Sequence, residues 1–202
     1  MRYGGFVLAY HGCDQSVGEK VLRGDADIIP SQNDYDWLGS GAYFWENSSA
    51  RALKWAEFLR DRPIPGTTKV KTPFVVGAVI APGNCLDLSE AVSLNVLRNA
   101  YEEYAVMMKA SAAPLPINEG GHPGDADLVK RKLDCAIINF LHASREENGE
   151  PPFDTVRCPF FEGAPLFPGA RIAERTHLQW SVRDPKKSVI GYYRPRNEES
   201  AA

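Results

Sequence analysis

Apolar residues recur along the chain in two patterns, which predict different elements. Short and mostly continuous apolar runs predict strands at 5–10, 42–45, 73–80, 153–158, 177–182 and 188–193. Stretches with apolar residues every three or four positions predict a helical turn at 16–24 and helices at 49–61, 90–111 and 127–145. A short extended piece is expected at 85–88, and the Pro- and Gly-rich stretch 112–124 has the composition of a loop. The pattern predicts one domain, 1–202, that mixes helices and strands.

Composition narrows the class of protein only slightly. The 202 residues carry 23 Lys and Arg against 26 Asp and Glu, a net charge of −3, which excludes a strongly basic nucleic-acid coat. Hydrophobic residues make up 44%, which is too many for a disordered chain. We find neither an apolar run long enough to span a membrane nor a secretory signal pattern at the start, so we expect a soluble, cytoplasmic protein. The four cysteines are scattered and predict neither a zinc site nor disulfides: Cys13, Cys85, Cys135 and Cys158.

Three segments place polar or aromatic side chains at the end or on the face of a predicted strand. They are Tyr10-His11-Gly12-Cys13, the run from Leu38 to Trp45 (LGSGAYFW), and the run from Thr176 to Val182 (THLQWSV). Taken singly, each segment has an ordinary explanation. A histidine after a strand is usually held in a turn, a tyrosine in an aromatic strand usually packs in the core, and a glutamine in a strand usually faces solvent.

Taken together and in this order, the segments resemble the ADP-ribosyltransferase superfamily, in its diphtheria-toxin-like and poly(ADP-ribose)-polymerase-like branch. His11-Gly12 is similar to the family's first strand, and Gly41-Ala42-Tyr43-Phe44 with Ser48-Ser49-Ala50 is similar to its second strand and the following helix. The segment 179–193 is similar to its late hairpin. The resemblance covers about 9–59 and 171–194, and the middle of the chain does not match. It implies an α+β fold with a split antiparallel or mixed sheet core, surrounding helices, and a helical insertion at about 85–150.

The resemblance also implies site residues. The catalytic set would be His11, Tyr43 and Gln179, where Gln179 stands in place of the family's glutamate. The NAD-binding set would include those three residues together with Gly12, Cys13, Gly41, Ser48 and Ser49. NAD would be the substrate, and we expect no metal. Family members without the glutamate generally transfer single ADP-ribose units or become inactive binders, so we expect mono-ADP-ribosylation.

The chemistry of NAD cleavage accounts for these residue types. Breaking the nicotinamide–ribose bond creates an oxocarbenium-like centre, which has to be held rigidly away from water. His11 can donate a hydrogen bond to a ribose hydroxyl, and Gly12 lets the backbone approach the nicotinamide amide because it has no Cβ. Tyr43 can stack on nicotinamide, an interaction worth about 0.5–1.5 kcal/mol beyond burial. Gln179 keeps a hydrogen bond but supplies neither charge nor a base.

A supplementary acid would therefore have to come from elsewhere. Glu46 follows Tyr43 by three residues and is our candidate catalytic acid, with Glu174 and Asp184 as further possibilities. The competing explanation for Glu46 is an acid that favours the N-terminus of the following helix. His177 precedes Gln179 by two residues, so both face the same side of their strand.

The sequence thus favours a mono-ADP-ribosyltransferase acting on a macromolecular acceptor, either protein or nucleic acid, in the manner of a bacterial toxin or phage-defence effector that a protein antitoxin would silence. Two other readings stay open. One is an inactive module that binds NAD or ADP-ribose. The other is a different NAD enzyme, either a glycohydrolase or an RNA 2′-phosphotransferase, the latter needing several arginines around the cleft. A thiol mechanism at Cys13 is disfavoured, and no Gly-rich phosphate loop is present.

Overall fold

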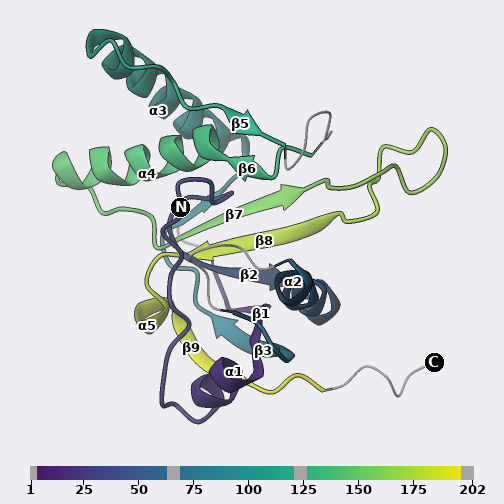
Figure 1. The fold of residues 1–202 in the computed structure, drawn as a ribbon. Coiled ribbons are helices and arrows are strands. Elements are labelled where there is room, and N and C mark those ends of the chain that lie inside the picture. Colours follow the sequence, from purple (N-terminus) through teal and green to yellow (C-terminus); the bar gives the residue numbers. More distant parts are fainter. Residues whose placement is uncertain (1–3, 63–68, 121–126, 197–202) are drawn as a thin grey trace.

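The computed structural model describes residues 4–62, 69–120 and 127–196. Along the chain the elements are β1 (Val7–Asp14), α1 (Gln15–Leu22), β2 (Ala42–Glu46), α2 (Ser49–Asp61), β3 (Pro73–Ile80), β4 (Cys85–Asp87), α3 (Ala91–Ala110), β5 (Asn118–Glu119), β6 (Lys130–Arg131), α4 (Lys132–Glu147), β7 (Thr155–Phe160), β8 (His177–Val182), α5 (Pro185–Ser188) and β9 (Val189–Tyr193) (Figure 1).

One mixed sheet of seven strands organises the molecule, in the order β4-β7-β8-β2-β1-β3-β9. Only the edge pair β4–β7 is parallel, and the other neighbours are antiparallel. The sequence prediction of an α+β fold is confirmed at this level. The proposed insertion at 85–150 needs correction, because β4 lies within that stretch and extends the main sheet.

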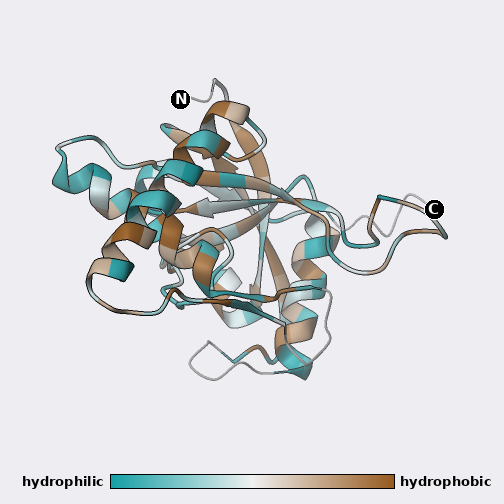
Figure 2. Ribbon diagram, turned by 90° about the horizontal axis from the view of Figure 1, so that it is seen from above, coloured by the Kyte–Doolittle hydropathy of each residue, from teal (hydrophilic) through white to brown (hydrophobic). Residues whose placement is uncertain are grey.

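The two faces of the sheet are covered by different helices. On one face, α1 packs over a core that includes Ala9, Phe44, Val76 and Trp180; we call this the α1 face. The other face carries α2 over β1 and β3, and α4 over β4 and β7, with α3 packed outside α4; we call this the α2/α4 face. Figure 2 shows brown, hydrophobic colour along the central strands, whereas the helices alternate between teal and brown.

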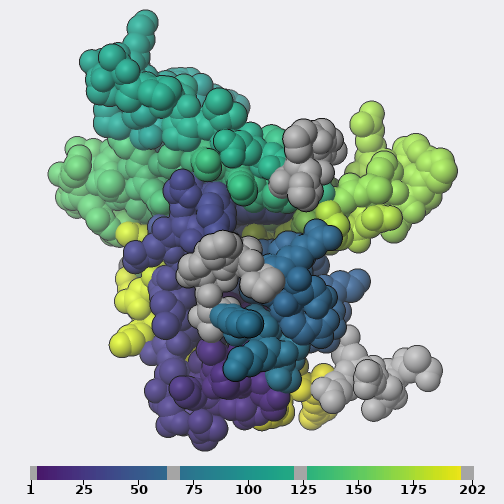
Figure 3. All heavy atoms as spheres, viewed as in Figure 1, coloured from purple at the N-terminus to yellow at the C-terminus, as the bar shows by residue number. Residues whose placement is uncertain are grey.

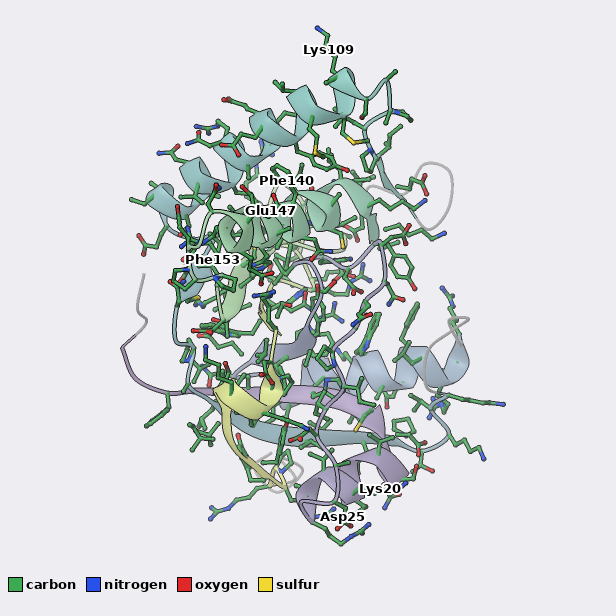
Figure 4. All side chains as sticks on the ribbon, turned by 90° about the vertical axis from the view of Figure 1, so that its left-hand side faces the viewer. Lys20, Asp25, Lys109, Phe140, Glu147 and Phe153 are labelled. Atoms are coloured by element: carbon green, nitrogen blue, oxygen red, sulfur yellow. The ribbon has the colours of Figure 1, made fainter. Side chains whose placement is uncertain are left out.

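The α3–α4 pair forms a subdomain-like layer at one end of the molecule. Phe140 of α4 lies between the two helices (Figure 4), and its ring centroid is 5.3 Å from that of Tyr104 on α3. Ala100 is the residue of α3 that is fully enclosed by this contact. The same view places Lys20 and Asp25, at α1, at the opposite end from Lys109.

Most predicted elements are found, and two differ in an informative way. The strands predicted at 73–80 and 177–182 and the helix at 49–61 have the predicted bounds. β1 is longer than predicted, because it pairs with β3 as far as Asp14–Pro73, so His11 and Gly12 lie within the strand and not at its end. The helix predicted from residue 127 begins at Lys132, because the two residues before it form β6.

Asn118 explains where α4 begins. Its side-chain oxygen accepts hydrogen bonds from the backbone N–H groups of Leu133 and Asp134, at 2.8 and 3.3 Å. These are donors that a helix leaves unsatisfied at its N-terminus. The cap comes from 15 positions upstream, so the local residues do not reveal it. Part of the loop predicted at 112–124 lies outside the described residues.

Among the described helices, none is long and apolar enough to cross a membrane. Within the same residues, no group of three His, Cys, Asp or Glu side chains is arranged to hold a metal ion.

Candidate functional site

The strands that carry the three predicted catalytic residues are neighbours in the sheet. His11 is on β1, Tyr43 on β2 and Gln179 on β8, and the sheet order runs β8-β2-β1. The β1–β2 ladder contains only two residue pairs, the last being Tyr10–Trp45. Beyond that pair the backbones of β1 and β2 are no longer paired. Instead, the Nδ1 atom of the His11 ring lies 2.8 Å from the carbonyl oxygen of Tyr43.

The hydrogen bond at His11 fixes the state of its ring. A carbonyl oxygen only accepts, so Nδ1 carries the hydrogen and donates it. Burial lowers the pKa of His11 below 6.5, with the bond to Tyr43 opposing that shift. The ring is therefore neutral at pH 7, and Nε2 is an acceptor. The sequence expectation that His11 donates to a ribose hydroxyl is corrected: a neutral ring whose Nδ1–H is already used can only accept there.

Strand alternation separates His11 from the other two side chains. Tyr43 pairs with Ser181, and Trp45 pairs with Gln179, so these four side chains share the α2/α4 face. His11 leaves β1 toward the α1 face, where its ring centroid is 5.6 Å from that of Phe44. The structure thus places Tyr43 and Gln179 on one face of the sheet. His11 lies on the other face, and its ring is hydrogen-bonded to the backbone carbonyl of Tyr43.

Tyr43 is held by its hydroxyl group. The hydroxyl donates to the carbonyl of Gly39 at 2.6 Å and accepts from the N–H of Leu38 at 2.8 Å. Burial raises the pKa of Tyr43 well above 10. A phenol held by both of its hydrogen bonds cannot serve as an acid or base near neutral pH, but its ring keeps a fixed orientation, and the residue as a whole is half-buried.

Around Tyr43, three buried polar atoms have no hydrogen-bond partner among the described residues. They are Gln179 Oε1, Ser181 Oγ and Trp45 Nε1. Gln179 is 7% exposed, and Trp45 is 4% exposed. Buried polar atoms in native proteins are almost always satisfied. The three atoms belong to paired residues of β2 and β8 and lie on the same face of the sheet as Tyr43.

The two predicted glycines have clear packing roles. A Cβ on Gly12 would lie 2.0 Å from the carbonyl oxygen of Ala52, so Gly12 allows α2 to approach β1 closely. A Cβ on Gly41 would lie 2.1 Å from Ser181 Oγ. The backbone N–H and C=O of Gly41 are both bonded to Ser31. The N–H of Gly41 is therefore not free to bind NAD, whereas Gly12 lies on β1 beyond its last pair with β2.

Cys13 is buried in the core beneath α1, where burial and the neighbouring Asp14 raise the pKa of its thiol to about 12. It is protonated at neutral pH, which agrees with the rejection of a thiol mechanism. Ser48 is the N-cap of α2 and accepts from the N–H of Arg51 at 3.3 Å. Ser49 is the first residue of that helix and stays partly exposed. The helix-capping role expected for this pair is therefore found at Ser48.

Glu46 does not join the Tyr43–Gln179 patch. It lies on the α1 face, where it accepts from Arg157 Nε and from Trp180 Nε1, both at 2.8 Å. Arg157 also bridges to Asp87 at 3.1 Å. The proposed role of Glu46 as a supplementary acid is thus corrected, because strand alternation and this ion-pair cluster direct it away. Of the other two candidates, Glu174 is exposed, and Asp184 caps α5.

Sequence reasoning missed the cationic and aromatic rim of the patch. Arg131 lies over the rings of Trp37 and Phe160, at 4.0 and 4.7 Å from the ring centroids. The His177 ring lies beside the same two rings, with centroids at 6.3 and 5.6 Å. Strand spacing does place His177 on the same face as Gln179, but nothing local in the sequence links Trp37 to Arg131.

A second part of the rim is an ion-pair cluster that joins α2 to the β7–β8 loop. Glu162 pairs with Arg51 of α2 and, at 3.1 Å, with Arg175, which also binds Asp127 at 2.8 Å. Arg51 and Glu162 are only 17% and 14% exposed. The loop that carries Glu162 projects beyond the body of the molecule (Figure 3). It is therefore fastened to the domain at its base, next to the patch.

Two hollows described in the structure lie away from this patch. One, of about 200 Å³, lies between α3 and α4 and is lined by residues such as Ala100 and Phe140. The other, of about 430 Å³, lies near α5 and is lined by residues such as Ser40, Asp154 and Lys187. Neither is lined by His11, Tyr43 or Gln179.

No family model matches the chain, and no solved structure matches it. An uncharacterized protein of Methanocaldococcus jannaschii is 46% identical over 49 residues. That match covers 24% of this chain and 22% of the relative.

Proposed function

We propose that the protein is a mono-ADP-ribosyltransferase, which transfers ADP-ribose from NAD to a protein or nucleic-acid acceptor and releases nicotinamide. The observation that carries the proposal is the patch of buried, unpartnered polar atoms beside Tyr43: Gln179 Oε1, Ser181 Oγ and Trp45 Nε1. Each unsatisfied buried group costs about 1–3 kcal/mol. A ligand with matching donors and acceptors would recover that cost, and the resemblance of the sequence to ADP-ribosyltransferases suggests NAD.

Each residue has a role in this proposal that its contacts support. The Tyr43 ring, held by its hydroxyl, would pack against nicotinamide. Gln179 would hydrogen-bond a ribose hydroxyl through its unpartnered oxygen. His11 would act from the α1 face as a positioning residue, holding the Tyr43 backbone through its hydrogen bond to the Tyr43 carbonyl. These contacts would hold the ribose while the bond to nicotinamide breaks.

An inactive NAD-binding module is the second candidate, and one observation favours it. Gln179 brings no charge to stabilise an oxocarbenium centre, and the nearby Glu46 is committed to Arg157 on the other face. Such a module would bind NAD through the same patch without releasing nicotinamide. The toxin or phage-defence context rests on the resemblance alone.

The two candidates are separated by incubating the purified protein with NAD labelled in the ADP-ribose part, together with a cell lysate. RNase treatment of one sample and protease treatment of another separate the two acceptor classes. The proposal expects free nicotinamide and label on macromolecules. NAD binding without nicotinamide release would favour the module, and neither binding nor release would overturn both.

A further inference from the structure

His177 lies where a base could act on the acceptor. It is two residues before Gln179 on β8, so both side chains are on the α2/α4 face, about 7 Å apart along the strand. Its pairing with Phe160 on β7 fixes the strand register at this point. Gln179 itself cannot take a proton, so a transfer that needs deprotonation of the acceptor depends on a neighbour of this kind.

One hydrogen bond determines which nitrogen of His177 can act. Nδ1 lies 2.7 Å from the carbonyl oxygen of Arg175, so Nδ1 carries the hydrogen and donates it. Nε2 is then the nitrogen with the free lone pair. The rings of Trp37 and Phe160 contact each other, with centroids 4.8 Å apart, and the imidazole lies beside both of them at tilts of 33° and 40°.

The charged groups around His177 come from several elements. Arg51 of α2 and Arg131 of β6 lower its pKa, Glu162 of the β7–β8 loop raises it, and Arg175 acts through its carbonyl. Burial is the largest cause, and the pKa lies below 6.5. The imidazole is therefore neutral, and able to accept a proton, throughout the neutral range. Glu162 is a poorer candidate because two arginines, Arg51 and Arg175, occupy its oxygens.

We infer that His177 is the general base of the proposed transfer, taking the proton from the acceptor at Nε2 in place of the carboxylate that Gln179 lacks. The inference rests on the proposed function. The bond between ribose C1′ and the nicotinamide nitrogen breaks, and its electron pair neutralises the pyridinium. A lone pair of the acceptor forms the new bond to C1′, and the acceptor's proton passes to Nε2 and then to solvent.

The test compares His177→Phe with His177→Ala in the full chain, using labelled NAD and the lysate as acceptor probe. His177→Phe keeps an aromatic ring beside Trp37 and Phe160, so it separates loss of a base from loss of packing. We expect both variants to lower the transfer rate by about 10², with little change in KM for NAD. Wild-type transfer should decline as the pH falls through the pKa of His177, and the variants should lack that limb. Added imidazole should restore part of the activity of His177→Ala only.

Equal transfer rates and pH profiles in wild type and in folded His177→Phe would overturn the inference and leave the proposed function standing. Failure of the wild type to release any nicotinamide would overturn both. A measurement without catalysis adds a separate criterion: NMR of ¹⁵N-labelled imidazole should show His177 neutral at pH 7 with its hydrogen on Nδ1. A hydrogen on Nε2 would contradict the inference whatever the activity.

Discussion

The Nδ1 atom of His11 lies 2.8 Å from the carbonyl oxygen of Tyr43, at the first position beyond the end of the β1–β2 ladder. The imidazole therefore replaces a backbone pair where the two strands part. This contact links two of the residues that the sequence pattern singles out, 32 positions apart. It also sets the chemistry of His11, because the ring is neutral and presents only an acceptor.

Replacing His11 by Phe should test this link. The ring contact with Phe44 is kept, but the Tyr43 carbonyl loses its donor. We expect a loss of about 1 kcal/mol in the free energy of unfolding, measured in urea, together with loss of nicotinamide release. Full activity in a His11→Phe protein would show that the contact has no functional role.

The ring and the hydroxyl of Tyr43 should have different functions: the ring supports nicotinamide release, and the hydroxyl stabilises the fold. Tyr43→Phe leaves the N–H of Leu38 and the carbonyl of Gly39 unpartnered, so we expect a loss of about 1–3 kcal/mol in stability with nicotinamide release retained. Tyr43→Ala should abolish release. The matched control is Tyr101→Ala, at an exposed tyrosine of α3, which should change neither quantity. If Tyr43→Ala binds NAD and releases nicotinamide as wild type does, Tyr43 is only a core residue.

Gln179→Glu should increase nicotinamide release, because a carboxylate at this position can stabilise the positive charge that develops on the ribose. Gln179→Ala should reduce release and leave the fold intact, as judged by circular dichroism. Val76→Asp, which buries a charge at a residue with no exposure, should unfold the protein. A folded Gln179→Glu variant with unchanged release would argue that position 179 does not contact the ribose.

The stability of the protein should fall in mild acid because of His142. Both ring nitrogens are buried without a partner among the described residues, and burial, with Arg183 and Arg145 nearby, lowers the pKa to about 3. The unfolded chain binds a proton near pH 6.5 and the folded chain does not, so stability is lost as the pH falls from 6.5 toward 3. We expect His142 to account for about 2 kcal/mol between pH 7 and pH 5.

Urea unfolding of wild type and His142→Leu at both pH values measures this contribution. The variant should lose less stability than wild type over the same interval. An identical pH dependence in the two proteins would mean that His142 is protonated in the folded state.

The sequence predicts the elements well where the signal is local. The apolar run 73–80 is bounded by Pro73 and by Pro82-Gly83, and α2 begins directly after the capping serine, Ser48. The sequence does not predict the bounds or pairing of an element when these depend on a residue far away in the chain. α4 begins at Lys132 because of a cap from Asn118, and β4 joins the sheet through its parallel pairing with β7.

In the candidate site, too, local features are predictable from the sequence and contacts between distant residues are not. Periodicity places Gln179 and His177 on one strand face, but the pairing of β2 between β1 and β8 comes from the fold alone. Glu46 looks available in the sequence, and its partner Arg157 lies 111 positions away. The tautomers of the two histidines follow from the backbone carbonyls of Tyr43 and Arg175, which no residue pattern indicates.

The most direct test of the central claim measures, by chromatography, the nicotinamide that the protein releases from NAD in the presence of lysate. Wild type is compared with the double variant His11→Ala, Tyr43→Ala and with the Tyr101→Ala control, after each has been shown to be folded. The account predicts release by wild type and by the control, and none by the double variant. Release that persists in the double variant, or its absence from wild type, would contradict the account.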